Sequence, residues 1–100
     1  MVKVALFARL EVKRGKEADM EKLLCQGLAM ALKEEKTPLW LSVRMGPSTF
    51  GIFDAFPDEE GRQDHLAGPI AAALMNQAKD LLKEPPVMEM MDVLAAKLPR

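Results

Sequence analysis

The segment from Thr49 to Glu60 reads TFGIFDAFPDEE and contains a strand, a stop and the beginning of a helix. From Phe50 to Phe56 the residues are apolar or glycine on both alternating sides apart from Asp54, which is typical of a strand covered on both faces. Pro57 ends the strand, and Asp58 is a candidate N-cap followed by an acidic first helical turn. We therefore predict a strand from Thr49 to Phe56 and a helix directly after it.

The sequence before this segment predicts two more strands and a helix. Lys3 to Val12 alternates with the period of a strand, and apolar residues from Met20 to Ala31 recur at helical spacing. Thr37-Pro38 ends that helix, and Leu39 to Met45 alternates again until Gly46-Pro47-Ser48 forces a tight turn. Because this turn is so short, the two strands that it joins should form an antiparallel hairpin.

The sequence after Glu60 predicts a helix with an interruption and a final strand. Gly68-Pro69 interrupts the helix, because proline lacks the amide donor and disfavours helical geometry in the residue before it. The helical pattern resumes from Ile70 to Leu81, so we expect a break or kink at this point. Pro85-Pro86 closes the helix, and Val87 to Lys97 has the length and β-branched content of a last strand.

The order βαββαβ predicts the α+β ferredoxin-like fold, a four-stranded antiparallel sheet with two helices on one face. One hundred residues, 49% of them apolar, suit a single domain over residues 1–100. The second face of the sheet should also be apolar, since Phe7 alternates with Leu6 and Phe53 with Ile52. Monomers seldom expose such a face, so we expect a homodimer that closes into an eight-stranded α/β barrel.

Composition excludes several classes of function. The formal net charge is −1 and charges of both signs are interspersed, so a nucleic-acid partner is not expected. No apolar run reaches the roughly 20 residues of a membrane span, and the N-terminus does not resemble a signal peptide, so we expect a cytoplasmic protein. Cys25 is the only cysteine, and no phosphate loop, metal-ligand cluster or nucleophile elbow is present. We therefore expect neither a metal nor another cofactor.

The segment Thr49 to Glu60, followed by GRQDHLAGP from Gly61 to Pro69, resembles the antibiotic biosynthesis monooxygenase family. In that family a strand ends in an acidic residue and an aromatic, the next helix carries His-Leu, and a proline follows. Val4 to Val12 with the turn Lys13-Arg14-Gly15-Lys16-Glu17 is similar to the family's first strand and turn. The resemblance covers nearly the whole chain. It implies a dimeric α+β barrel that oxidises quinols or polyketide phenols with molecular oxygen, without metal, flavin or haem.

Two residues are the candidates for catalysis. His65 matches the family histidine, which implies a general base or a hydrogen-bond partner for the substrate, although the histidine could equally be structural. Asp54 lies in an otherwise apolar strand, so its carboxylate must be paired, hydrated in a cavity or protonated. The alternative to a role in a pocket is a salt bridge from Asp54 to Arg44 or Arg9.

Four residues are the candidates for substrate binding. Trp40 could form a flat wall for an aromatic ring, and Arg44 could hold an anionic substrate oxygen. Phe7 and Phe53 could line the same pocket. The alternative for all four is that they fill the core or the dimer interface.

The chain departs from the family pattern at three positions. Phe56 replaces a common tryptophan, Leu41 a common tyrosine, and Ile70 a second histidine. With no tyrosine in the chain, a phenolic proton shuttle is excluded, and His65 would act alone. The leading hypothesis is a cofactor-independent monooxygenase that oxidises an aromatic, phenolic or quinol-type small molecule with O2. The alternatives are a non-catalytic small-molecule-binding or interaction module and a haem-degrading enzyme with His65 as the axial ligand.

Overall fold

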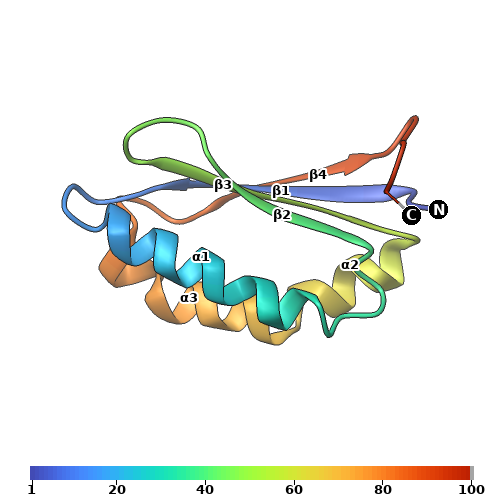
Figure 1. Cartoon of the computed structure of the whole chain (residues 1–100), viewed down its shortest axis with the longest axis horizontal. Coiled ribbons are helices and arrows are strands. Elements are labelled where there is room, and N and C mark those ends of the chain that lie inside the picture. Colours follow the sequence, from blue (N-terminus) through green and yellow to red (C-terminus); the bar gives the residue numbers. More distant parts are fainter. Residues whose placement is uncertain (100) are drawn as a thin grey trace.

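A computed structural model describes residues 1–99 and has the ferredoxin-like fold that the sequence predicts. Its sheet is antiparallel throughout, with strand order β2-β3-β1-β4. All three helices lie on one side of that sheet (Figure 1). The elements in chain order are β1 (Val4–Glu11), α1 (Glu17–Ala31), β2 (Leu39–Arg44), β3 (Thr49–Phe56), α2 (Glu59–Leu66), α3 (Pro69–Leu81) and β4 (Val87–Asp92).

The main core lies between the helices and the sheet. Alternate residues of β1, including Leu10, face α1 and α3, and so do Phe50 and Ile52 of β3. Met20 and Leu74 bring the apolar sides of α1 and α3 onto this surface. Each of these five side chains is at most 6% exposed, so their burial supplies the principal hydrophobic stabilisation of the fold. None of the helices within residues 1–99 is long and apolar enough to cross a bilayer.

The interruption at Gly68-Pro69 divides the predicted helix into α2 and α3. Gly68 has extended backbone angles, φ −91° and ψ −177°, and Pro69 is the first residue of α3. Proline is favoured at this position because the first helical amide has no partner within the helix. The predicted N-cap is confirmed, since the Asp58 side chain accepts a hydrogen bond of 2.9 Å from the amide of Gly61. Together the two caps fix the direction in which each helix leaves its loop.

The last strand is shorter than predicted: β4 ends at Asp92 rather than Lys97. The amide of Val93 still bonds to the carbonyl of Lys3, but β1 begins at Val4 and offers no further partner. Val93 and Leu98 instead pack against a small second core on the sheet face opposite the helices. That second core consists of Val2, Ala5 and Ala55, with Leu39 and Phe53 beside it.

The rest of that opposite face is not covered by this chain (Figure 1). Phe7 and Phe53 are cross-strand partners on it and are half-buried. Leu41 is the partner of Phe53 on β2 and is 40% exposed, while Val87 and Met91 on β4 are 50% and 36% exposed. The sheet is therefore apolar on both faces, as the alternation of its strands predicts.

Candidate active site

Three ionisable side chains meet at one end of the space between the sheet and the helices. The ring nitrogen Nδ1 of His65 lies 2.7 Å from Oε1 of Glu34, and Nε2 lies 2.8 Å from Oδ2 of Asp54. His65 is 5% exposed and Asp54 is 1% exposed, and the Glu34 side chain is 17% exposed. The imidazole is thus held between two carboxylates, and we call this group the carboxylate–histidine–carboxylate cluster.

Each member of the cluster comes from a different element. Asp54 is in the middle of β3 on the side that faces the helices, and His65 is in the last turn of α2. Glu34 follows α1 in the loop to β2, where its Oε1 also accepts a 2.9 Å hydrogen bond from the hydroxyl of Thr37. The ring of Phe56 lies 5.4 Å from the His65 ring and closes the apolar side. The cluster therefore joins the sheet, α2 and the α1–β2 loop.

The two carboxylates change the protonation of His65. Burial by itself lowers the pKa of the imidazole, but the contacts with Asp54 and Glu34 outweigh burial and raise the pKa above its ordinary value. A raised pKa favours the imidazolium, which donates from both ring nitrogens. The two carboxylates therefore give His65 more positive charge near neutral pH than an isolated histidine would carry.

This shift predicts how stability depends on pH. A histidine with a raised folded-state pKa contributes fully below its unfolded pKa of about 6.5, and the contribution is lost as pH rises through the folded-state value. Unfolding by urea, followed at several pH values from about 6 to 9, should show wild type losing its advantage over His65→Gln as pH increases. An advantage that stays constant or grows with pH would show that the imidazole is neutral in the folded chain.

The cluster leaves three buried acceptors without an aligned donor. No protein group within residues 1–99 makes a well-oriented hydrogen bond to Oε2 of Glu34 or to either oxygen of Asp54. The Nε2–Oδ2 contact between His65 and Asp54 is an ion-pair contact whose angle departs from that of a hydrogen bond. Buried acceptors without donors are costly, and such groups are concentrated at sites that bind a ligand or move a proton.

An open cavity of about 320 Å³ lies against the cluster. Its wall includes Glu34 and His65, together with the start of α3. Gly68 also lines it, and a Cβ at that position would lie 3.6 Å from Oε2 of Glu34 and 3.3 Å or less from backbone oxygens. The glycine therefore keeps the approach to Oε2 free of a side chain. The remaining lining residues are Glu35, Lys36, Thr37, Gly61, Asp64 and Pro69.

The structure brings the two predicted catalytic residues, His65 and Asp54, into contact. The alternative that Asp54 pairs with an arginine is wrong. Arg44 contacts Glu21 at 3.7 Å and stacks on a phenylalanine, and Arg9 lies on the other face of the sheet and pairs with Glu11. Arg44 lies four residues along β2 from Trp40, the cross-strand partner of Asp54, and Arg9 lies on the opposite face of the sheet. Neither arginine can therefore reach Asp54.

The four predicted substrate-binding residues do not form one pocket in a single chain. Trp40 is the register partner of Asp54 and shares its face of the sheet, and Arg44 is on that face four residues farther along β2. Phe7 and Phe53 project from the opposite face. Strand alternation already separates Phe53 from Asp54, because adjacent residues point to opposite faces.

Sequence reasoning missed Glu34. It lies in the α1–β2 loop, 31 residues before His65, in the acidic run Glu34-Glu35. The only local signal is its spacing of three residues from Thr37, which permits the hydroxyl contact observed here. That spacing does not point to His65, so the pairing could not be predicted without the fold.

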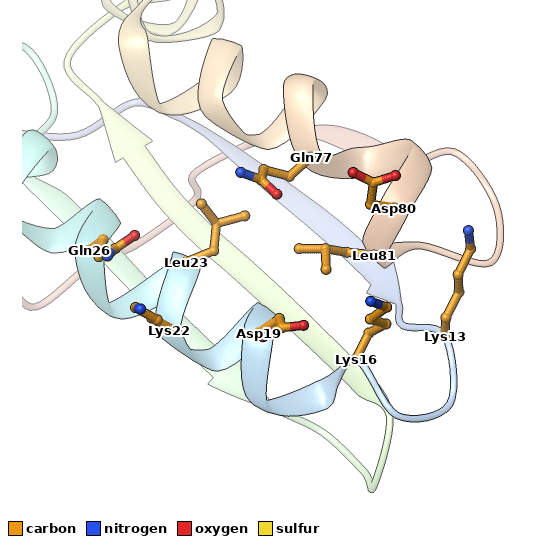
Figure 2. A pocket seen from close by; sticks show the side chains of 9 residues that line it. All are labelled: Lys13, Lys16, Asp19, Lys22, Leu23, Gln26, Gln77, Asp80 and Leu81. Atoms are coloured by element: carbon orange, nitrogen blue, oxygen red, sulfur yellow. The ribbon is translucent and has the colours of Figure 1, made fainter.

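The largest groove is a different feature and lies between α1 and α3 at the far end of the molecule from α2 (Figures 1 and 2). Figure 2 shows side chains of both signs around it, and its volume is about 630 Å³. Its polar lining is exposed to solvent, and Lys13 is tied to the carbonyl of Lys79 at 2.6 Å. The groove contains no buried polar group in need of a partner, so the cluster at His65 is the stronger candidate.

The donor set around His65 does not fit haem. An axial histidine needs a free ring nitrogen, whereas both nitrogens of His65 contact carboxylates. His65 is also the only histidine in the chain. Within residues 1–99, no three histidine, cysteine, aspartate or glutamate side chains are arranged to hold a metal ion.

Among solved structures, the chain is similar to NE2512, a protein of unknown function from Nitrosomonas europaea. It is 54% identical over 100% of this chain and 97% of its own, with a TM-score of 0.98. The chain belongs to the NE2512 family. Neither a protein-family model nor a curated protein matches the chain.

Solved structures of lower sequence identity share the fold of the chain. A putative antibiotic biosynthesis monooxygenase from Nitrosomonas europaea has a TM-score of 0.83 and 13% identity, over 92% of this chain and 90% of that one. A putative antibiotic biosynthesis monooxygenase from Deinococcus radiodurans has a TM-score of 0.78 and 17% identity, over 97% of this chain and 98% of that one. These matches confirm that the NE2512 family has the fold of the antibiotic biosynthesis monooxygenases, as the sequence resemblance implied.

Proposed function

We propose that the protein is a cofactor-independent monooxygenase that oxidises a neutral phenol or quinol with O2. The carboxylate–histidine–carboxylate cluster carries this proposal, because it places Glu34, whose Oε2 has no donor, in the wall of a cavity of about 320 Å³. Support also comes from the fold, which this chain shares with structures named as putative antibiotic biosynthesis monooxygenases.

Each residue of the cluster has a different role in the proposed reaction. Both ring nitrogens of His65 contact carboxylates, so the imidazole is not free to take a proton from a substrate. Its role is to provide positive charge that stabilises the deprotonated substrate. Glu34 is the base, because it lines the cavity and its Oε2 has no donor. Asp54 orients the imidazolium from the other side.

Proton removal is sufficient to begin the reaction. Glu34 accepts the hydroxyl proton, and the resulting electron-rich anion passes one electron to O2, after which the substrate radical and superoxide combine into a C–O bond. The O–O bond then breaks. One oxygen atom stays on the ring, and the other leaves as water with two substrate hydrogens. The substrate supplies all four electrons that O2 receives, so no further reductant is needed.

The lining of the cavity selects the charge of the substrate. Glu34, Glu35 and Asp64 contribute carboxylates, and the one lysine, Lys36, already contacts Asp64 at 3.2 Å and Glu60 at 3.0 Å. An anionic substrate would meet net negative charge here, whereas a hydroxyl group can donate to it. The volume suits one or two aromatic rings.

Oxygen uptake tests this function directly. The protein should consume O2 in step with a neutral quinol, and with ¹⁸O2 one labelled atom should appear in the product and the other in water. Carboxylated phenols should be poorer substrates. Quinol loss without oxygen uptake, or unlabelled product, would contradict the monooxygenase function. Quinol binding without any turnover would favour the second candidate function, a small-molecule-binding module, with which the two carboxylate contacts of the His65 ring also agree.

We also propose that the protein is a homodimer closed through the uncovered sheet face. Four strands of about six residues present a face of roughly 400 Å², the size of the largest apolar patch on a typical protein, which is often a functional surface. Sedimentation at micromolar concentration should give twice the 11.1-kDa mass of the chain. Phe53→Asp should give monomers, whereas Leu94→Asp, at a 97% exposed position off the sheet, should not. A wild-type monomer would contradict this assembly.

A further inference from the structure

A small apolar slot lies inside the helix–sheet layer, next to the cluster but distinct from its cavity. Its free volume is about 20 Å³, which is room for one molecule the size of water or dioxygen. Its walls are residues of α1, α3, β2 and β3: Leu23, Leu24, Gly27, Met30, Trp40, Ile52, Ile70, Ala73 and Leu74. Apart from the indole N–H of Trp40, no side chain in this lining carries a hydrogen-bonding group. A slot of this kind favours an apolar occupant over water, which needs two or more polar partners.

Trp40 supplies the one polar atom of the slot. Its Nε1 is buried and no acceptor within residues 1–99 receives a hydrogen bond from it. The ring atoms Cζ2 and Cη2 face Gly27, at 3.2 Å and 3.3 Å from where a Cβ would lie. Nε1 belongs to this same edge of the indole. Glycine on α1 therefore makes room for the indole edge, and Nε1 is a buried donor without an acceptor.

The slot and the cavity are neighbours. Pro69 lines the cavity and Ile70, the next residue of α3, lines the slot. On the sheet side, Trp40 of the slot is the cross-strand partner of Asp54 in the cluster. The slot and the cavity share no lining residue, but their walls adjoin at the start of α3 and at the Trp40–Asp54 pair.

We propose that this slot binds dioxygen and holds it beside the substrate, an inference that rests on the proposed monooxygenase function. Dioxygen is apolar and fits the free volume, and it needs no hydrogen bond to enter. Once the substrate anion has given it one electron, the superoxide formed is an anion that can accept a hydrogen bond from Nε1 of Trp40. The donor thus interacts with the oxygen only after reduction, which favours electron transfer.

Methyl relaxation under oxygen pressure tests the binding site without any substrate. The paramagnetic effect of O2 should be larger at the buried methyls of Ile52, Ile70 and Leu74 than at exposed Met75 and Leu32. Gly27→Ala should abolish this excess, because its Cβ would press on the indole of Trp40 and move it into the free space, and alanine is the better helix former, so folding is retained. The matched control Ala29→Ser adds one heavy atom on the exposed side of α1 and should change nothing. Relaxation that follows solvent exposure alone would overturn the proposal.

Kinetic measurements distinguish O2 binding in the slot from the chemical step at the cluster. Gly27→Ala should raise the KM for O2 about tenfold, since one extra carbon in a fitted apolar pocket has an effect of this size, and should leave the KM for the quinol unchanged. Trp40→Phe should keep the relaxation effect but lower kcat by about tenfold or more. An unchanged KM for O2 in Gly27→Ala would contradict the proposal. If no quinol is oxidised, the proposed function fails while the relaxation result still decides whether O2 occupies the slot.

Discussion

Replacing His65 by alanine is expected to lower the free energy of unfolding by about 3–5 kcal/mol, the usual cost of removing one partner from a buried ion pair. The variant leaves the carboxylates of Asp54 and Glu34 buried without the cation between them, and Phe56 loses its ring contact. Urea unfolding near pH 6, where the raised pKa of His65 favours the imidazolium, measures the loss.

Two variants of His65 separate charge from packing in this measurement. His65→Gln keeps a donor and most of the volume, so it should lose less stability than His65→Ala. Gln63→Ala, two residues earlier on the exposed side of α2, removes only a surface contact with Glu59 and should cost less than about 1 kcal/mol. A loss below about 1 kcal/mol for His65→Ala would show that the cluster is not an ion-paired unit.

Glu34→Gln is expected to lower kcat for quinol oxidation by about 10²- to 10⁴-fold, the usual contribution of a positioned general base. The amide keeps the size of the side chain and can still accept from Thr37, but it cannot take a proton from the substrate. If Glu34 acts only in the chemistry, the KM for the quinol should change little. Oxygen uptake under saturating substrate provides the measurement.

Glu35→Gln is the matched control for this experiment. Glu35 lines the same cavity and is exposed, but it makes no contact with His65. It should retain kcat within about threefold, because it removes an exposed charge from the cavity wall but leaves the proton acceptor and its contact with His65 in place. If Glu34→Gln keeps wild-type kcat while remaining folded, the base is another group, and Asp54 becomes the candidate.

The sequence by itself determined the fold and the positions at which the helices begin. Thr49 to Phe56 reads as a strand because its apolar residues continue on both sides, and Asp58 and Pro69 begin helices through chemistry that is local to them. The prediction was wrong about the end of the last strand: β4 stops at Asp92, where β1 begins at Val4, and Val93 and Leu98 pack against the second core instead. Strand ends depend on the partner strand, which lies far away in the sequence.

Only the tertiary structure decided which residues form the site. His65 and Asp54 could be selected singly as unusual residues in their elements, but their contact depends on how α2 crosses the sheet. Glu34 joins them across 31 residues, and Trp40 and Gly27 meet only because α1 packs on β2. Hydrophobic periodicity specifies which face of an element is buried, not which element covers it, so contacts between polar side chains at these junctions emerge only when the layers pack.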